Sequence, residues 1–255
     1  MNKIFISTLF IIITIAGRAQ TAEMPDISAD RPGMATPPSI SQPREIQIET
    51  GFSYEKIRYE NNFQETILYN STLLRYGITK NSEIRIQTDF AQVKTDSSNI
   101  TGFNPLTIGT KLLLMEEKGI LPQTSFLFNL TLPWIGEKQF RPGNLAPSIY
   151  LLMQNDLTKK INVCYNIGIE YDGESPVPAE FAAICFGYGI TGKLNGFIEN
   201  YNWFSNRSKP ENFIDLGFAY LIGKNLQIDL SANISIQDIE KYIMINSGVS
   251  WRIPN

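Results

Sequence analysis

The sequence predicts an all-β fold, a transmembrane antiparallel up-and-down β-barrel of about 12 strands, after a signal peptide and a short periplasmic N-terminal segment. Three observations predict it. The N-terminus carries a secretory signal, apolar and polar residues alternate in segment after segment, and short connections alternate with longer ones. The last such segment, 242–253, alternates up to Trp251, which is typical of the closing strand of a barrel.

Residues 1–19 are predicted to be a signal peptide. Lys3 precedes an almost wholly apolar stretch, 4–16, and small residues flank the site Gly17-Arg-Ala19. The stretch is too short for a hydrocarbon core roughly 30 Å thick, which disfavours the alternative of an N-terminal anchor. A mature chain that crosses a membrane would therefore do so as a barrel, since no later apolar run is long enough for a helix.

Composition excludes several classes of function. The formal charge of −3 becomes −5 once Lys3 and Arg18 leave with the signal, so nucleic acid is not an expected partner. The chain has no histidine, and hence no imidazole base, no Ser-His or Cys-His dyad and no histidine metal ligand. We expect no catalytic residues, no metal and no cofactor.

Residues 20–43 are predicted to form an extended periplasmic segment. Five prolines in this stretch rule out a central strand, because proline donates nothing to a β-ladder. Two alternatives remain open. The stretch Asp30-Arg-Pro32 enters the barrel mouth and partly plugs it, or the whole segment is a tether.

Residues 44–253 are predicted to form the barrel. In the first strand Ile46 and Ile48 alternate with Gln47 and Glu49, so one face meets an apolar medium and the other does not. The predicted strands are 44–57, 64–78, 82–94, 103–116, 122–133, 145–156, 160–171, 179–190, 193–203, 212–222, 225–236 and 241–253.

The connections between these strands fall into two classes. The short ones, at 78–81, 117–120, 157–160, 190–193 and 222–225, resemble one another, and each carries a lysine. The longer ones include 95–102, 134–144, 172–178 and 204–211. Short turns lie on the periplasmic side of bacterial barrels, which places both termini in the periplasm. The alternative, a soluble β-sandwich, would leave large apolar patches in water.

Several short motifs recur in the same order as in a known family. They are Ser28-Ala-Asp-Arg-Pro32, Gln47-Ile-Glu-Thr-Gly-Phe52, Thr72-Leu-Leu-Arg-Tyr-Gly-Ile-Thr79, Glu83-Ile-Arg85, Gly109-Thr-Lys111, Leu130-Thr-Leu-Pro133, Leu226-Gln-Ile-Asp-Leu-Ser231 and Val249-Ser-Trp-Arg252. From about residue 27 to the C-terminus, the chain resembles the outer-membrane transporter family associated with meta-pathway phenol degradation. The resemblance implies a barrel that moves small aromatic or hydrophobic compounds. This chain departs from the usual barrel ending, since Pro254 and Asn255 follow its last strand.

If even-numbered residues of the first five strands face lipid, charged residues at odd-numbered positions of those strands point into the lumen. Alternation judged strand by strand sends further charges inward on the later strands. The candidates are Glu49, Arg75, Arg85, Asp89, Lys111, Glu170, Glu199, Asp215, Asp229 and Arg252. They form either a constriction that selects solutes or a set of ion pairs that fill a mid-sized barrel, and for most of them ion pairing is favoured.

Two smaller groups share this inward parity. Phe197, Tyr201 and Trp203 fall on the same face as Glu199, which indicates either a site for an apolar or aromatic solute or residues of an interfacial girdle. Cys164 and Cys185 would lie opposite one another across a hairpin, either as a cross-strand disulfide or as two free thiols.

The sequence therefore predicts a protein of the bacterial outer membrane that passes small organic solutes by passive diffusion through a charge-lined lumen. Its expected partners are outer-membrane lipid, the solutes and the barrel-assembly machinery, which would read the C-terminal strand. Two alternatives stay open. One is a lipid-modifying barrel enzyme without histidine, and the other is an occluded structural or adhesion barrel.

Overall fold

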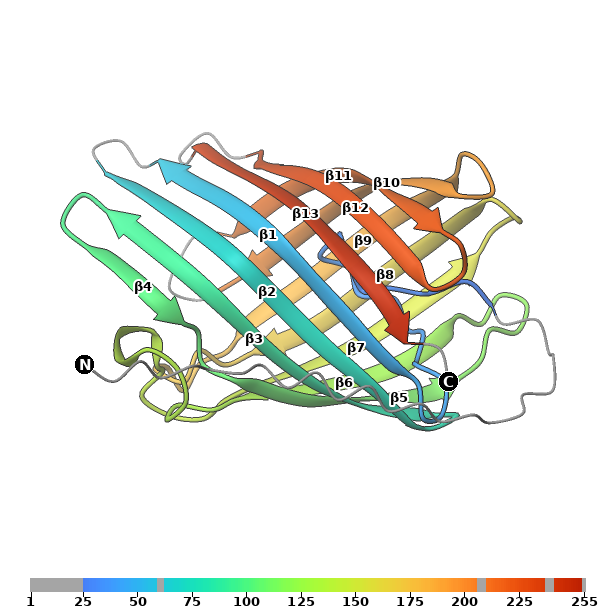
Figure 1. The fold of residues 1–255 in the computed structure, drawn as a ribbon, viewed down its shortest axis with the longest axis horizontal. Helices are drawn as coiled ribbons and strands as arrows, with labels where there is room; N and C mark the ends of the chain where they lie inside the picture. Colours follow the sequence, from blue (N-terminus) through green and yellow to red (C-terminus); the bar gives the residue numbers. More distant parts are fainter. Residues whose placement is uncertain (1–24, 59–61, 206–209, 237–240, 254–255) are drawn as a thin grey trace, which may run out of the picture.

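A computed structural model describes residues 25–58, 62–205, 210–236 and 241–253. Thirteen strands form one antiparallel sheet that closes on itself, because β1 pairs with β13 along its whole length, from Ile46 opposite Ile253 to Arg58 opposite Lys241 (Figure 1). The strands are β1 (Ile46–Arg58), β2 (Phe63–Thr79), β3 (Ser82–Thr95), β4 (Asn99–Phe103), β5 (Thr107–Met115), β6 (Gln123–Thr131), β7 (Ala146–Asp156), β8 (Ile161–Glu170), β9 (Ala179–Gly189), β10 (Leu194–Phe204), β11 (Glu211–Ile222), β12 (Leu226–Ser235) and β13 (Lys241–Ile253).

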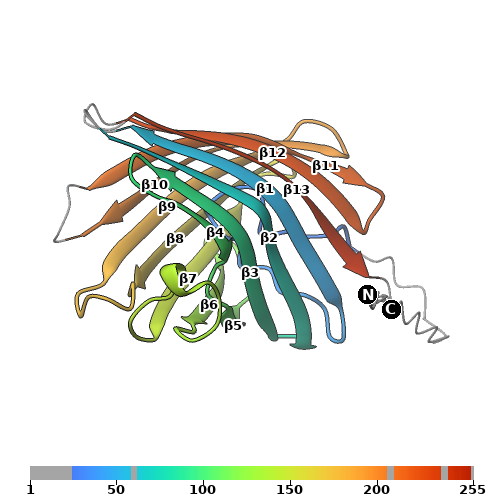
Figure 2. The same ribbon diagram turned by 60° about the vertical axis from the view of Figure 1, so that its left-hand side comes forward.

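The predicted barrel is confirmed, and it has twelve positions around its wall, because β4 and β5 share one of them. β3 pairs with β4 through residues 90–94 and with β5 through residues 82–87 (Figure 2). The prediction of one strand over 103–116 was wrong. Proline has no backbone donor, and Pro105 lies in the gap that divides this stretch between two strands. Residues 99–102, expected in a loop, belong to β4.

The loop that follows β6 covers this break in the wall. Leu132 N donates to Leu106 O at 2.9 Å, and Glu137 N donates to Phe103 O at 2.7 Å. The loop also contains the one short helix in the described part of the chain, η1 (Lys138–Phe140). No helix in that part is long and apolar enough to cross a membrane.

The two faces of the wall differ in polarity as the alternation predicts. On β12, the outward-facing Ile228 and Leu230 are 42% and 54% exposed, whereas the inward-facing Gln227 and Asp229 are each 7% exposed. Exposed apolar side chains of this kind occur on the outer face of strand after strand. Such a surface is unfavourable in water but matches hydrocarbon, and it places the barrel in the outer membrane.

Residues 25–43, named here the inner segment, lie inside the barrel (Figures 1 and 2). The segment begins at the short-turn rim, where Ile27 N donates to Lys224 O at 2.8 Å. It reaches its deepest point near Met34 and Ala35 and returns to the same rim before β1. An irregular, proline-rich chain inside a barrel needs partners for its backbone groups, and the lumen side chains provide them.

Candidate functional site

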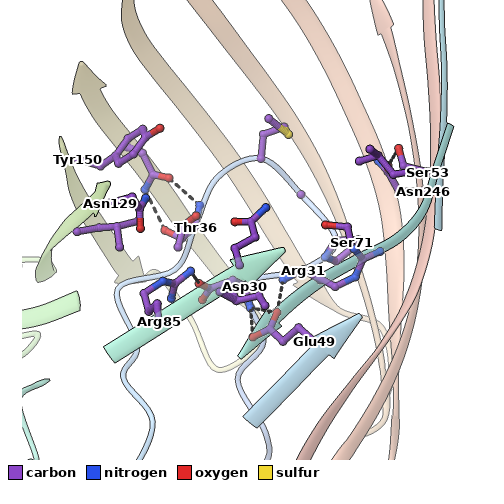
Figure 3. A pocket seen from close by; sticks show the side chains of 18 of the residues that line it. Asp30, Arg31, Thr36, Glu49, Ser53, Ser71, Arg85, Asn129, Tyr150 and Asn246 are labelled. Atoms are coloured by element: carbon purple, nitrogen blue, oxygen red, sulfur yellow. Dashed lines mark hydrogen bonds and ion pairs between the residues drawn. The ribbon is translucent and has the colours of Figure 1, made fainter. Parts of the chain in front are cut away.

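The half of the lumen near the short turns contains a balanced set of buried charges, named here the ionic cluster: Asp30, Glu49, Arg75, Glu83, Arg85 and Lys111. Asp30 of the inner segment is its centre. Its carboxylate lies 3.1 Å from Arg75 Nη1, 2.6 Å from Arg85 Nη2 and 2.9 Å from Lys111 Nζ. Figure 3 shows Asp30 between Arg85 and Glu49.

The other two carboxylates of the ionic cluster join the barrel wall to the inner segment. Glu49 accepts from the backbone N–H groups of Asp30 and Arg31 and lies 3.0 Å from Arg75. Glu83 lies 3.0 Å from Arg75 Nε and 2.8 Å from Arg85 Nη1, and it accepts from Ser41 N. Three cations therefore meet three anions, which is what makes burial of so many charges tolerable.

Two further arginines hold the inner segment to the last two strands. Arg31 forms an ion pair with Asp229 of β12 at 3.0 Å, with a second contact at 3.3 Å from Nε. Arg252 of β13 donates to the carbonyl of Pro25 at 2.6 Å and lies 3.8 Å from Glu45. The segment is thus also fixed to β12 and β13, which follow β1 around the wall.

The deepest part of the inner segment is bound by β8 and β10. Glu199 accepts from Met34 N at 2.9 Å and from Ala35 N at 2.8 Å, and it is 1% exposed. Asn166 accepts from Thr36 N at 2.7 Å and donates to Thr36 O at 3.0 Å. Side chains of the wall therefore satisfy the backbone polar groups where the segment turns.

Aromatic rings line one side of the other half of the lumen, near the longer loops. This aromatic arc consists of Tyr150, Phe181, Tyr201, Trp203, Phe213 and Tyr242. Successive rings lie close together, with centroids 5.9 Å apart for Tyr150 and Phe181, 5.1 Å for Phe181 and Trp203, and 4.7 Å for Phe213 and Tyr242. The arc comes from β7, β9, β10, β11 and β13, and its spacing is that of interacting rings.

Two carboxylates border the aromatic arc. Glu170 of β8 accepts from Tyr150 Oη at 2.7 Å and from Trp203 Nε1 at 3.2 Å. Glu55 of β1 accepts from Tyr242 Oη at 3.2 Å. Neutral donors thus hold both carboxylates.

A cavity of about 420 Å³, named here the vestibule, lies above the inner segment, on the side of the longer loops. Aromatic residues of the arc line it together with polar residues from the opposite wall, such as Ser53 and Asn246, and the inner segment forms its floor (Figure 3). A second cavity of about 230 Å³ lies on the other side of that segment, at the short-turn rim, next to Arg252 and Glu45. The inner segment therefore separates two spaces within one lumen.

The structure places every charged residue predicted for the lumen inside the barrel, although in different surroundings. Glu49, Arg75, Arg85 and Lys111 belong to the ionic cluster. Asp229 and Arg252 hold the inner segment, Glu199 binds its backbone, and Glu170 borders the aromatic arc. Asp89 accepts from Ser71 Oγ at 2.8 Å nearer the long-loop rim, and Asp215 is fully buried opposite Asn233.

The predicted aromatic group is divided. Tyr201 and Trp203 belong to the aromatic arc, their rings 5.3 Å apart. Phe197 lies lower, against Gly33 of the inner segment. Sequence reasoning missed Glu83 and Asn166 as functional residues, although both have the inward parity of the charged candidates on their strands.

Cys164 and Cys185 are register partners on β8 and β9, and both are free thiols in the structure. The Cys164 thiol donates to the carbonyl of Thr36 at 3.5 Å. A cross-strand disulfide in oxidised protein stays a prediction. In the part of the chain that the structure covers, no three His, Cys, Asp or Glu side chains form a group able to hold a metal ion.

Known proteins share this fold at low sequence identity. A family model described as "Putative MetA-pathway of phenol degradation" matches residues 29–253. An outer membrane channel from Pseudomonas putida F1 superposes with a TM-score of 0.70 at 10% identity, over 88% of this chain and 99% of that chain. No curated protein matches the chain.

Two other solved barrels are less similar. The KdgM porin, in complex with disordered oligogalacturonate, has a TM-score of 0.53 at 8% identity, covering 80% of this chain and 99% of that chain. The translocator domain of the autotransporter NalP from Neisseria meningitidis has a TM-score of 0.53 at 10% identity, covering 82% and 88%. These likenesses establish the fold of an outer-membrane barrel.

Proposed function

The chain belongs to this phenol-degradation family, and we propose that it is an outer-membrane channel through which small organic solutes pass without energy coupling. One observation carries the proposal: a vestibule of about 420 Å³ that combines aromatic rings with polar side chains inside a membrane barrel. Sites for small molecules have this size and this mixture of surfaces. The outer membrane channel and the KdgM porin have a similar fold, which supports the proposal that this barrel is also a channel.

In this proposal the vestibule is a binding station and the inner segment is a plug. A solute from outside would rest against the aromatic arc, which offers apolar contact area. The inner segment blocks its way to the lower cavity. The ionic cluster holds both the descending part of this segment, at Ser28, and the returning part, at Pro37 and Ser39. Passage then requires the segment to shift or to leave the lumen.

The anchoring of the inner segment also favours a second candidate, an occluded barrel with a structural or adhesive role. Arg75 alone donates to the carbonyls of Ser28 at 3.0 Å and Ser39 at 3.1 Å, so one buried side chain holds both the descending and the returning part of the segment. A segment held so firmly would serve a permanently closed barrel equally well. In both candidates the closure of β13 on β1 makes β13 the strand that we expect the assembly machinery to read.

Liposome swelling distinguishes the two candidates. The full mature protein and a variant lacking residues 25–42 would be compared with arabinose and benzyl alcohol as solutes. If the inner segment is a plug, the deletion accelerates swelling with both solutes above the rates of the intact protein and of protein-free liposomes. Heat-modifiable migration on gels checks that the variant still forms a barrel.

Two outcomes would contradict the proposal. Equal swelling of the intact and shortened proteins would show that residues 25–42 do not close the lumen. If neither folded protein accelerates swelling above that of protein-free liposomes with either solute, the occluded barrel would be favoured.

A further inference from the structure

We propose that the vestibule selects organic cations, that is, an ammonium group carried on an aromatic or apolar body, and that Glu170 is its anchor. The inference rests on the proposed function, because it names the solute class for the same lumen. It comes from the charges that line the vestibule and from the way in which each is neutralised.

The hydrogen bonds of Glu170 leave half of its carboxylate available. Tyr150 and Trp203 both donate to the same oxygen, Oε1, at 2.7 Å and 3.2 Å. Among the residues described, none donates to Oε2. An ionised carboxylate offers about four acceptor sites, so the side chain retains capacity for a charged donor while its two neutral partners fix its position.

Glu170 also lacks a positive partner among the described residues. Other charged groups that line the vestibule are already matched: Asp30 and Arg85 form an ion pair at 2.6 Å, and Arg31 pairs with Asp229 at 3.0 Å. Glu49 is matched by Arg75. The charge left uncompensated at the vestibule wall is therefore negative and belongs to Glu170.

The rings beside Glu170 suit the same kind of solute. Tyr150, Phe181 and Trp203 line the vestibule together with this carboxylate. Aromatic faces attract cations through their quadrupole, and Trp is the strongest of the three ring types. A carboxylate among aromatic rings recognises an ammonium group by charge and its organic body by contact area, whereas it repels a carboxylate or phenolate.

The opposite end of the aromatic arc repeats the arrangement. Tyr242 donates to Glu55, and Glu55 has no ion pair with any lysine or arginine in the described ranges. Lys56, the next residue, is paired with Glu65 instead. A cation moving along the arc would thus meet a carboxylate at each end.

Isothermal titration calorimetry on the purified full mature barrel in a non-ionic detergent tests the inference. The probes are benzylammonium, its near-isostere benzyl alcohol, and benzoate. We expect benzylammonium to bind about tenfold more tightly than benzyl alcohol, the size of a cation–π contact joined to a charged hydrogen bond. Benzoate should show no binding.

Glu170→Gln is the decisive variant, because the amide keeps an acceptor oxygen for Tyr150 and Trp203 but removes the negative charge and the free acceptor Oε2. It should reduce the affinity for benzylammonium to that of benzyl alcohol and leave benzyl alcohol unchanged. Glu180→Gln is the matched control. Glu180 is an exposed carboxylate on β9 that borders a different cavity, among outer-face residues such as Ile167, and its loss should change neither affinity.

The outcomes separate this inference from the proposed function. Equal affinities for benzylammonium and benzyl alcohol, unchanged in Glu170→Gln, would overturn the cation preference even where swelling still shows passage of benzyl alcohol. An equal loss in the Glu180→Gln control would overturn the assignment of Glu170. Failure of every solute to bind and to cross would remove the proposed function as well.

Discussion

The two halves of the lumen neutralise their carboxylates in different ways. In the ionic cluster each carboxylate meets at least one arginine or lysine at 3.1 Å or less, and Asp30 meets three. Along the aromatic arc Glu170 and Glu55 are held by the polar atoms of Tyr and Trp side chains. Hydrogen bonds hold the carboxylates in both halves, but only in the ionic cluster are their negative charges balanced by positive ones.

The difference indicates separate roles for the two halves. A balanced buried cluster is strongly destabilised when one partner is removed, because the remaining charges are then buried without compensation. It is suited to holding a segment in place. Carboxylates held by neutral donors keep acceptor capacity, which suits a surface that must bind and release a solute.

The largest effect should come from Asp30→Asn, which tests whether the ionic cluster holds the inner segment. The change leaves three cations facing two anions, and the loss of one partner of a buried ion pair costs about 3–5 kcal/mol. The inner segment should leave the lumen much more often, so that single-channel conductance in planar bilayers rises. Asp26→Asn, at an exposed position of the same segment, is the control and should conduct as the unmodified protein does.

Conductance that is unchanged in Asp30→Asn would mean that the ionic cluster does not hold the segment. The two halves of the lumen would then not have the separate roles assigned to them.

A smaller effect is expected from Trp203→Leu, which tests the aromatic side. Removing this ring takes away contacts with Phe181 and Tyr201 and a face that lines the vestibule. Aromatic contacts of this kind are worth about 0.5–1.5 kcal/mol, so the dissociation constant for benzylammonium should rise up to about tenfold. Titration calorimetry measures it, and the basal conductance should not change.

Trp251→Leu is the matched control for this prediction, because Trp251 is 46% exposed on the outer face of β13. An equal loss of affinity in both variants would show that the loss does not depend on the vestibule.

The smallest effect is expected from mild acid. Burial would raise the pKa of the Asp30 carboxyl, but Arg75, Arg85 and Lys111 together hold that pKa well below its usual range. A lowered pKa in the folded state gives a stability that is fully present above the unfolded value, about 3.9, and lost as the pH falls towards the folded pKa. The conductance change that depends on Asp30 should therefore be absent between about pH 7 and about pH 5 and appear only below about pH 4.

A rise in conductance near pH 6 that occurs in the unmodified protein and is lost in Asp30→Asn would contradict this assignment. Asp30→Asn, which has no carboxyl at this position, should lack the transition below pH 4.

Much of the wall could be predicted from local pattern. Eleven of the twelve predicted strands have both observed ends within two residues of those expected. The inward parity of residues such as Glu49, Arg85 and Asp229 followed from the same alternation, because a charge that faces hydrocarbon is costly. The error at 103–116 came from giving more weight to alternation than to Pro105, which ends the ladder locally.

The partners of these inward charges could not be predicted in the same way. Arg75 meets Asp30, Glu49 and Glu83, which come from the inner segment and from two different strands. Trp203 reaches Glu170 across 33 residues of sequence. Such pairs depend on the register between strands and on where the barrel closes.

The chain alone specified which side of each strand faces lipid, because side-chain direction has a period of two residues and the medium on each side enforces it. It did not specify that residues 25–43 would enter the lumen, nor that one half would be balanced by ions and the other by aromatic donors. Those features arise when twelve wall positions close around a shared interior and residues distant in sequence must satisfy one another's charges and backbone groups.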